Sequence, residues 1–362
     1  MATKRIHNFG AGPAVLPVPV LEEACENMLS LGDLGMGIME ISHRSKQFSA
    51  IIEEAEADLR ELLNLPADFH VLFLQGGATL QFSMVPMNLL GPNQTADYIV
   101  TGVWSEKAVK EAKKVGEVHI AADTKAENHN RIPQAAEIKL SQSPAYVHFT
   151  SNNTIFGTQW PAEPAGADGL LVVDASSDIL SRPLAIDKYA VIYAGAQKNL
   201  GPSGLALLIV RDALLSRCCD SLPTYLNYKI HVQSKSLYNT PNTWGVYLMG
   251  LVFKWIKSQG GLKAMEEANR AKAGVLYDAI DGSDFFRGHA EPESRSMMNV
   301  TWRLPTEELE GRFIAAAEAA GLSGLKGHRN VGGLRASIYN ACPRRAVEDL
   351  VAFMNDFESK NG

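Results

Sequence analysis

Two apolar runs on either side of a single lysine constrain the fold of this chain more than any other feature. The first, Tyr189 to Tyr193, is rich in β-branched and aromatic residues and ends in the small residues Ala194 to Ala196. The second, Gly204 to Val210, is almost wholly apolar, which is typical of a strand covered on both faces. Lys198 and a Gly201-Pro202 break lie between the runs. The pattern therefore predicts a buried sheet with Lys198 at the end of one strand.

A lysine on such a rigid support has chemical uses that an exposed lysine lacks. Partial desolvation lowers the pKa of the amine, and the neutral amine can form a Schiff base with a carbonyl cofactor such as pyridoxal phosphate. The alternative is a loop lysine that points into water, and that alternative is favoured for a lysine considered alone. Lys198 alone therefore does not distinguish the two interpretations, and a second feature of the sequence is required.

Asp174 supplies that feature. Gly169 to Val173 is a buried-type run that ends in Asp174. The carboxyl ends of parallel strands meet at one edge of an open α/β sheet, so Asp174 and Lys198 are expected to lie together. A pyridoxal phosphate enzyme needs a carboxylate that faces the pyridinium nitrogen, because the protonated ring is an electron sink. Asp174 alone is equally well interpreted as a helix cap or a turn residue.

Strands alternate with helices as far as about residue 210, which predicts an α/β fold with a largely parallel sheet. Further strands are predicted at 69–74, 97–101, 145–150, 297–302 and 334–338. Helices are predicted at 19–31, 48–63, 80–89, 106–115, 244–256, 262–280, 306–320 and 343–357. A chain of 362 residues should hold about two domains. We expect a large domain at 15–262 and a small C-terminal α+β domain at 263–362, joined by the segment 1–14.

Several loops in this pattern offer groups for an anion or a flat ring. Gly76 to Thr79 turns a strand into a helix, whose free N–H groups attract phosphate, although two glycines also suit a plain tight turn. His43 and Arg44 precede another helix, where the alternative is a solvated basic loop. The Trp104 indole, at a strand exit before a helix, can stack on a ring or pack in the core. Thr154 can offer its hydroxyl to a ring substituent or cap a turn.

Charge and cysteine content exclude several classes of function. The net charge of −6, without clustered basic runs, argues against a nucleic-acid or anionic membrane surface. No apolar run reaches the length of a membrane span, and prolines interrupt the N-terminal stretch, so no signal peptide is predicted. The four cysteines and nine histidines show no metal-ligand spacing. We therefore expect reduced thiols, a cytoplasmic location and no metal site.

Five segments occur in an order that matches a known family. They are Ile41 to Arg44, Gly76 to Phe82, Asp174 to Pro183, Ala194 to Pro202 and Gly332 to Asn340. Together they resemble the phosphoserine aminotransferases, which are class V pyridoxal phosphate aminotransferases, and the likeness runs to the last helix. The resemblance implies a fold-type I transferase with a seven-stranded, mainly parallel sheet in its large domain. It also implies a homodimer with shared active sites.

The resemblance assigns a role to each candidate residue. Lys198 would carry pyridoxal 5'-phosphate and move the substrate's α-proton, and Asp174 would face the pyridine nitrogen. Trp104 would stack on the cofactor ring, and Thr154 would lie at the ring hydroxyl. The cofactor phosphate would be bound by Ala78, Thr79 and Gln197. Asn239 and Thr240 would reach the same phosphate from the partner subunit. Arg335 would clamp the α-carboxylate, for which a bidentate guanidinium is suited. The anion-binding set for substrate phosphate or side-chain carboxylate would be His43, Arg44, His328 and Arg329.

Two positions depart from the pattern of this family. Ala11 and Thr79 stand where some members carry Ser and Arg. At these two positions the resemblance therefore extends to backbone contacts rather than to contacts through the side chains.

The implied reaction is reversible amino transfer between L-glutamate and 3-phosphohydroxypyruvate, giving O-phospho-L-serine and 2-oxoglutarate in serine biosynthesis. The family often also serves 4-phosphohydroxy-L-threonine in pyridoxine biosynthesis, which the sequence leaves open. One alternative is an aminotransferase for an unphosphorylated acid, such as alanine and glyoxylate. An unphosphorylated substrate would not explain the two basic residues His328 and Arg329. A cysteine desulfurase needs an exposed thiol, whereas Cys342 is expected to pack at a helix start. A cofactor-free binding protein would lack visible absorbance.

Overall fold

The centre of the molecule, a computed structural model that describes residues 5–362, is a seven-stranded sheet. In spatial order the strands are β2 (Phe69–Gln75), β10 (Leu205–Arg211), β9 (Tyr189–Gly195), β8 (Leu171–Asp174), β5 (Val147–Thr150), β3 (Thr95–Val100) and β4 (Glu117–Asp123). β10 is antiparallel to its neighbours β2 and β9, and the remaining pairs are parallel. The predicted seven-stranded, mainly parallel sheet is confirmed. All strands except β10 therefore end at the same edge.

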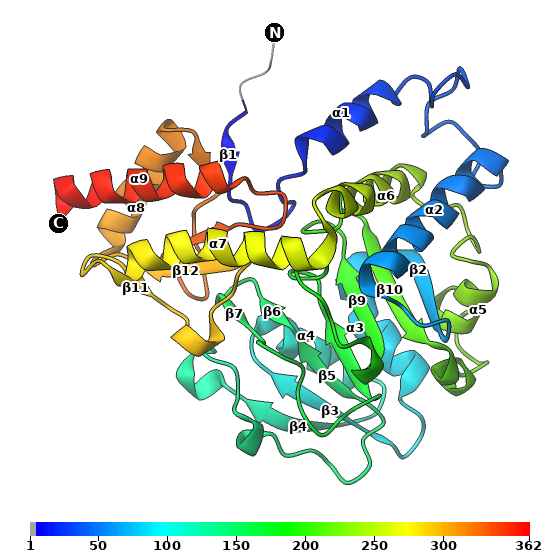
Figure 1. Ribbon diagram of the computed structural model, residues 1–362. Coiled ribbons are helices and arrows are strands. Elements are labelled where there is room, and N and C mark those ends of the chain that lie inside the picture. Colours follow the sequence, from blue (N-terminus) through cyan, green and yellow to red (C-terminus); the bar gives the residue numbers. More distant parts are fainter. Residues whose placement is uncertain (1–4) are drawn as a thin grey trace.

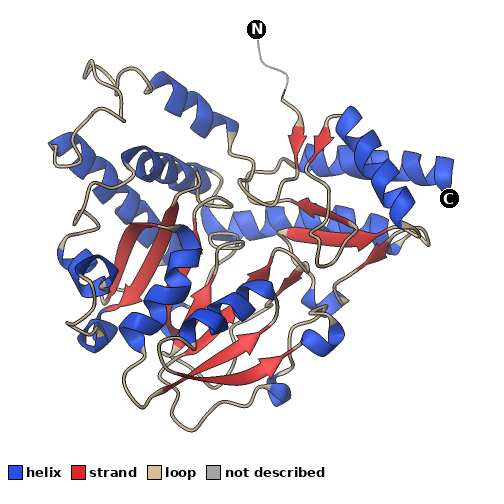
Figure 2. Ribbon diagram, turned by 180° about the vertical axis from the view of Figure 1, so that it is seen from behind, coloured by secondary structure: helices blue, strands red, loops and turns tan. Residues whose placement is uncertain are grey.

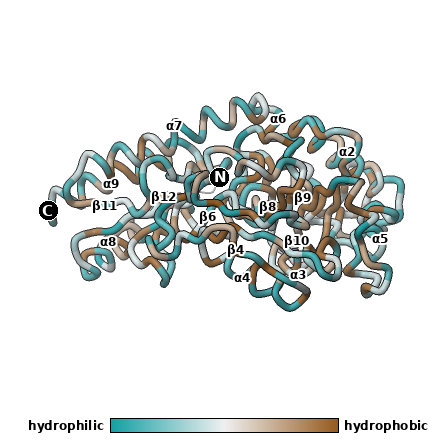
Figure 3. The backbone as a smooth tube through the Cα atoms, turned by 90° about the horizontal axis from the view of Figure 1, so that it is seen from below, coloured by the Kyte–Doolittle hydropathy of each residue, from teal (hydrophilic) through white to brown (hydrophobic). Residues whose placement is uncertain are grey.

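Helices cover both faces of this sheet (Figures 1 and 2). One layer contains α2 (Lys46–Leu63) and α6 (Thr243–Ser258), and the other contains α3 (Gly77–Leu89) and α4 (Val103–Ala112). Side chains alternate between the two layers: Phe73 of β2 packs in the α2 and α6 layer, and the adjacent Leu72 packs in the α3 and α4 layer. Because both faces are buried, β9 and β10 are continuously apolar, as the brown tube in Figure 3 shows.

A smaller unit is built on a three-stranded sheet, and Figure 1 shows it at the C-terminal side. Its elements are β11 (Arg287–Gly288), β12 (Asn299–Arg303), β14 (Leu334–Ser337), α8 (Glu307–Ala319) and α9 (Arg344–Asn361). Phe9 belongs to its core, and β1 (His7–Asn8) pairs with β13 (Leu322–Ser323). The N-terminal segment is thus packed into the smaller unit.

The long helix α7 (Gly261–Asp281) belongs to both units. Leu262 and Met265 near its start pack in the core of the large sheet, whereas Leu276 and Ile280 near its end pack in the core of the smaller unit. The division into 15–262 and 263–362 remains a prediction, and the helix spans both sides of it.

Several helix boundaries differ from those predicted: α3 begins at Gly77 instead of residue 80, and α9 ends at Asn361 instead of residue 357. The helix expected at 19–31 is α1 (Val18–Glu26), and the helix expected at 106–115 begins at Val103. Trp104 therefore lies in the first turn of α4 rather than ahead of the helix. The reason is Ser105, whose hydroxyl accepts a hydrogen bond from Thr101 N and donates one to Gly102 O, which closes the turn early.

The remaining elements of residues 5–362 are α5 (Tyr228–Gln233), the short hairpin of β6 (Asn152–Asn153) and β7 (Thr158–Gln159), and six short 3₁₀-helices. Across residues 5–362, no helix is both long enough and apolar enough to span a lipid bilayer.

Candidate active site

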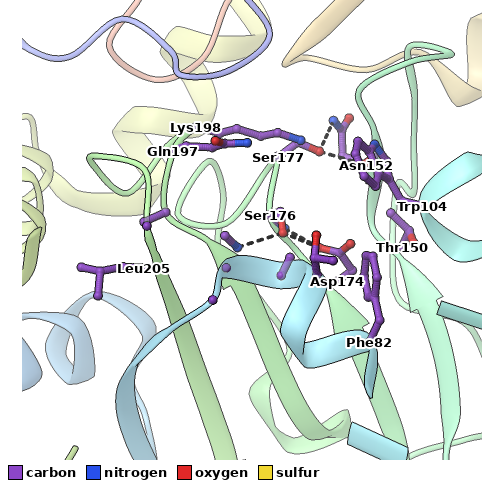
Figure 4. Close-up of a pocket in the computed structure, with 17 residues that line it drawn as sticks. Phe82, Trp104, Thr150, Asn152, Asp174, Ser176, Ser177, Gln197, Lys198 and Leu205 are labelled. Atoms are coloured by element: carbon purple, nitrogen blue, oxygen red, sulfur yellow. Dashed lines mark hydrogen bonds between the residues drawn. The ribbon is translucent and has the colours of Figure 1, made fainter. Parts of the chain in front are cut away.

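A cavity of about 290 Å³ opens where β8 and β9 end and α3 begins (Figure 4). Asp174 is the last residue of β8, and Lys198 lies in the connection from β9 to β10. The residues predicted from the sequence that line this cavity are Ala78, Thr79, Trp104, Asp174, Gln197 and Lys198. The shared edge of the parallel strands thus brings together side chains that are as far apart in the chain as Ala78 and Lys198.

Lys198 is half-buried in the wall of the cavity. Its Nζ donates a hydrogen bond to Thr154 Oγ1 at 2.5 Å. Burial lowers the pKa of Lys198 to about 8, and the nearby carboxylate of Asp174 partly opposes this decrease. Near neutral pH, a larger fraction of Lys198 is therefore a neutral, nucleophilic amine than for an exposed lysine.

Asp174 is buried, and its two carboxylate oxygens have different surroundings. Oδ1 accepts hydrogen bonds from the backbone N and the Oγ of Ser176, at 3.0 and 2.5 Å. Oδ2 accepts no hydrogen bond from residues 5–362. Burial raises the pKa of Asp174, whereas the Ser176 hydrogen bonds and the charge of Lys198 lower it. The carboxylate thus has one oxygen left for an N–H group in the cavity.

The start of α3 forms the part of the cavity that suits an anion. Gly76 and Gly77 adopt positive φ values of 88° and 60°, which allows the sharp turn from β2 into the helix. Ala78 and Thr79 lie in the first turn, where backbone N–H groups have no partner within the helix. A Cβ at Gly195 would lie 3.4 Å from Ala78 N, so the glycine keeps this side open. A phosphate group fits such a helix start.

Trp104 gives the cavity a flat apolar wall. Its ring centroid lies 5.9 Å from Lys198 Nζ, so the indole borders the space in front of the amine. This placement suits stacking on a planar ring that is attached to, or lies beside, Lys198.

Arg335 reaches the same region from β14 of the smaller unit. Its Nη1 donates a hydrogen bond to the backbone O of Thr154 at 3.3 Å. Because Lys198 bonds to the hydroxyl of that residue, Thr154 holds the ammonium and the guanidinium beside each other. The Nε of Arg335 is buried and has no hydrogen-bond partner within residues 5–362. A half-buried guanidinium with a buried, unused Nε donor suits a carboxylate ligand.

Comparison with known proteins agrees with this geometry. A family model described as aminotransferase class-V matches residues 6–350. The phosphoserine aminotransferase of Geobacillus kaustophilus is 54% identical to this chain over 99% of both chains. The chain belongs to the phosphoserine aminotransferase family. The solved structure of the family member from Bacillus circulans subsp. alkalophilus, 50% identical, matches with a TM-score of 0.97 over 99% of this chain and 100% of that one.

A more distant phosphoserine aminotransferase shows that the fold extends across the family. The PLP-bound structure of the Trichomonas vaginalis protein is 38% identical and matches with a TM-score of 0.93, over 97% of this chain and 100% of that one. This chain is accordingly an aminotransferase with the class V fold.

The predicted anion-binding residues of this aminotransferase lie in two places. His328 and Arg329 belong to the smaller unit, near Arg335: burial lowers the pKa of His328, and the positive charges of Arg335, Arg329 and Lys107 lower it further. His43 and Arg44 lie on the connection between α1 and α2, which Figures 1 and 2 show at the large-sheet end, away from the smaller unit. One chain therefore does not bring all four residues together.

Asn239 and Thr240 also lie outside the cavity lining of their own chain. They stand at the end of β2, where Gln75 Nε2 donates a hydrogen bond to Thr240 O at 3.3 Å and Asn239 Nδ2 donates one to Gln75 Oε1 at 3.4 Å. Thr240 is exposed and Asn239 is half-buried, which is compatible with the predicted contact with another subunit; that contact stays a prediction.

Two features of the cavity are not predicted above from the sequence. Ser176 donates hydrogen bonds to Asp174. This contact is predictable in principle, because a backbone N–H two residues after an Asp often bonds that carboxylate. Asn152 lines the cavity and donates a hydrogen bond to Asn299 Oδ1 at 2.7 Å, and Asn299 Nδ2 bonds Ser337 Oγ at 2.9 Å on the strand that carries Arg335. No local pattern predicts this link, since it joins residues about 150 positions apart.

Proposed function

We propose that this aminotransferase transfers an amino group between L-glutamate and 3-phosphohydroxypyruvate, giving 2-oxoglutarate and O-phospho-L-serine for serine biosynthesis. Its cofactor is pyridoxal 5'-phosphate. The observation that carries the proposal is the cavity lined by Lys198 and Asp174, with Arg335 joined to Lys198 through Thr154, in a chain 54% identical to a phosphoserine aminotransferase. Whether 4-phosphohydroxy-L-threonine is also a substrate is a separate question of specificity.

The residues of the cavity fit the proposed cofactor. Asp174 Oδ2 is free to accept a hydrogen bond from the ring nitrogen, and the first turn of α3, with Ala78, Thr79 and the nearby Gln197, suits the phosphate. Trp104 would cover a ring face, and the Thr154 hydroxyl, which bonds Lys198, would be near the ring substituents. When bound, the cofactor supplies a carbonyl carbon for the amino group and a protonated ring that withdraws electrons from the substrate's Cα.

Each of the residues in and around the cavity is proposed to have a separate role in the reaction. Lys198 would hold the cofactor, and its amine is the group placed to move the proton at the substrate's Cα. Arg335 binds the α-carboxylate, which orients Cα toward the amine that Thr154 holds beside it. Asp174 would accept the N–H of the ring nitrogen and so favour its protonated form. Arg329 would supply positive charge for the distal phosphate of the substrate, and His328, whose pKa is lowered, would supply a ring N–H donor.

The lowered pKa of Lys198 predicts the pH dependence of cofactor attachment. Only the neutral amine is a nucleophile, so the attachment rate should rise with pH, with a midpoint near 8 and a plateau above it. An exposed lysine would give a rate that still rises near pH 10. Stopped-flow absorbance of apoenzyme mixed with pyridoxal 5'-phosphate measures the profile, with circular dichroism as the control for folding at each pH. A rate that keeps rising beyond pH 9 would contradict the assignment.

Substrate choice gives a second prediction. Replacing His328 and Arg329 together with alanine should lower kcat/KM for O-phospho-L-serine more than for L-glutamate, because the phosphate carries more charge and more acceptors than a carboxylate. Each charge-assisted hydrogen bond lost costs about 1.5–3 kcal/mol, so the phosphoserine reaction should slow at least about tenfold. An unchanged ratio of the two kcat/KM values would show that the pair is not the phosphate site.

We further propose a homodimer with shared active sites. His43 and Arg44 lie away from His328 and Arg329 in one chain, so the anion-binding set is complete only if a second copy supplies one of the pairs. The α1 to α2 connection that carries His43 also exposes Leu29, which is 86% accessible, and Met39, which is 57% accessible. Apolar side chains this exposed suit an interface.

Mixing two inactive variants tests the shared sites. One variant carries Lys198→Ala, and the other carries Asn239→Ala with Thr240→Ala. A hybrid dimer would have one site with Lys198 from one chain and Asn239 and Thr240 from the other, so activity should reappear after the subunits exchange. Each variant alone is the control. If both sets act within one chain, mixing restores nothing.

The four cysteines bear on location. Cys25, Cys218, Cys219 and Cys342 are all free thiols, and Cys342 is buried, as its position at a helix start suggested. Free thiols persist in a reducing compartment. We therefore propose that the enzyme works in the cytoplasm.

A further inference from the structure

We propose that Ser176 is a positioning residue that keeps Asp174 ionised and aimed at the cofactor's ring nitrogen. The inference rests on the proposed function, because it takes Asp174 as the partner of that nitrogen. Ser176 follows β8 by two residues and lines the cavity. It touches the carboxylate rather than the reacting atoms, so its effect must pass through Asp174.

The hydroxyl of Ser176 links two strand ends. Its Oγ donates a hydrogen bond to Asp174 Oδ1 at 2.5 Å and accepts one from the backbone N of Gly195 at 2.9 Å, as Figure 4 shows. The backbone N of Ser176 donates to the same Oδ1 at 3.0 Å. One oxygen of the carboxylate is therefore held by two donors from a single residue.

Counting hydrogens fixes the direction of these bonds. A hydroxyl has one hydrogen, and the Gly195 N–H occupies a lone pair of Oγ, so the hydroxyl hydrogen points to Oδ1. With the Ser176 N–H on the same atom, Oδ1 cannot carry a proton without losing one of these bonds. Any proton on the carboxylate is thus confined to Oδ2, on the cavity side, where the ring nitrogen would share it. Donors aimed at a carboxylate favour its ionised form.

The same hydroxyl ties Asp174 to the segment that carries Lys198. Gly195 ends β9, and Lys198 follows it by three residues. The backbone here is close to both neighbours, since a Cβ at Gly195 would lie 3.4 Å from Ala78 N and 3.7 Å from Ser176 Oγ. Ser176 therefore fixes the carboxylate relative to the strand end that positions the amine.

A double-mutant cycle tests this inference through cofactor binding rather than through turnover. The dissociation constant of pyridoxal 5'-phosphate is measured by fluorescence titration of apoenzyme for the unaltered chain, Ser176→Ala, Asp174→Ala and the double variant. Loss of a charge-assisted hydrogen bond should weaken binding about ten- to a hundredfold in Ser176→Ala. If Ser176 acts through Asp174, the same change should have almost no further effect in the Asp174→Ala background.

Ser177 is the matched control, because it is the next residue and lines the same cavity, but its Oγ bonds to the backbone O and the Nδ2 of Asn152 instead. Ser177→Ala should change binding by the same factor with and without Asp174. Ser176→Thr, which keeps a hydroxyl on Cβ, should bind the cofactor better than Ser176→Ala, and it serves if the alanine variant does not fold.

The outcomes separate the inference from the function on which it rests. Independent effects of Ser176→Ala and Asp174→Ala, or unchanged binding in Ser176→Ala, would overturn the role of Ser176 and leave the aminotransferase site intact. Unchanged binding in Asp174→Ala would instead overturn the cofactor assignment.

Discussion

Lys198→Ala is expected to abolish transamination while leaving the protein folded. The amine has two tasks, attachment of the cofactor and proton transfer at the substrate's Cα, and no other amine lines the cavity within residues 5–362. General acid–base catalysis alone contributes about a hundred- to ten-thousand-fold, so turnover should fall at least about a thousandfold. The fold should survive, since the only hydrogen bond that Lys198 Nζ makes within these residues is to Thr154. Steady-state kinetics and thermal unfolding measure the two effects.

A second lysine of the chain is the matched control for the chemistry. Burial also lowers the pKa of Lys272 to about 8, but its Nζ is enclosed by the backbone carbonyls of Ile338, Tyr339, Asn340 and Cys342. Borohydride reduction of the holoenzyme followed by peptide mapping should therefore label Lys198 and leave Lys272 unmodified. A label on any other lysine, or turnover that persists in Lys198→Ala, would contradict the assignment.

Arg335→Ala is expected to impair every substrate by a similar, large factor. All substrates of the reaction share an α-carboxylate, and Arg335, which is joined to Lys198 through Thr154, has a buried Nε donor without a partner in residues 5–362. Two charge-assisted hydrogen bonds of about 1.5–3 kcal/mol each correspond to a loss of at least about a hundredfold in kcat/KM. The measurement is kcat/KM for O-phospho-L-serine and for L-glutamate in the same variant.

Arg335→Lys distinguishes charge from geometry. A lysine keeps the positive charge but lacks the planar fork that binds both oxygens of a carboxylate, so activity should recover only in part. A variant in which one substrate is impaired and the other is not would show that Arg335 binds the distal group instead of the α-carboxylate.

The sequence predicted the parts of the site that follow strand ends. Lys198 and Asp174 each come directly after an apolar run, and parallel strands end at a common edge, so their proximity follows from local patterns. The first turn of α3 was predictable for the same reason, because two glycines mark the turn out of β2. The fold class followed from the alternation of strands and helices.

Other parts of the site depend on contacts that no local pattern contains. The helix α4 begins earlier than predicted because the Ser105 hydroxyl closes a turn at Gly102, and Trp104 therefore lies inside the helix. Residues of the smaller unit reach the cavity through the long-range bond from Asn152 to Asn299. In the proposed homodimer, His43 and Arg44 would act together with a second chain, and a single sequence carries no signal for how two copies meet.

The most direct test of the proposed function is the amino-transfer half-reaction of the holoenzyme. O-phospho-L-serine, L-serine, L-glutamate and L-alanine are added one at a time, and the visible absorbance of the cofactor is followed. We expect O-phospho-L-serine and L-glutamate to convert the absorbance of the aldehyde form to that of the amine form rapidly, and L-serine and L-alanine to do so far more slowly. Equal rates for O-phospho-L-serine and L-serine would show that the phosphate is not recognised, and rapid conversion by L-alanine alone would indicate an enzyme for an unphosphorylated acid.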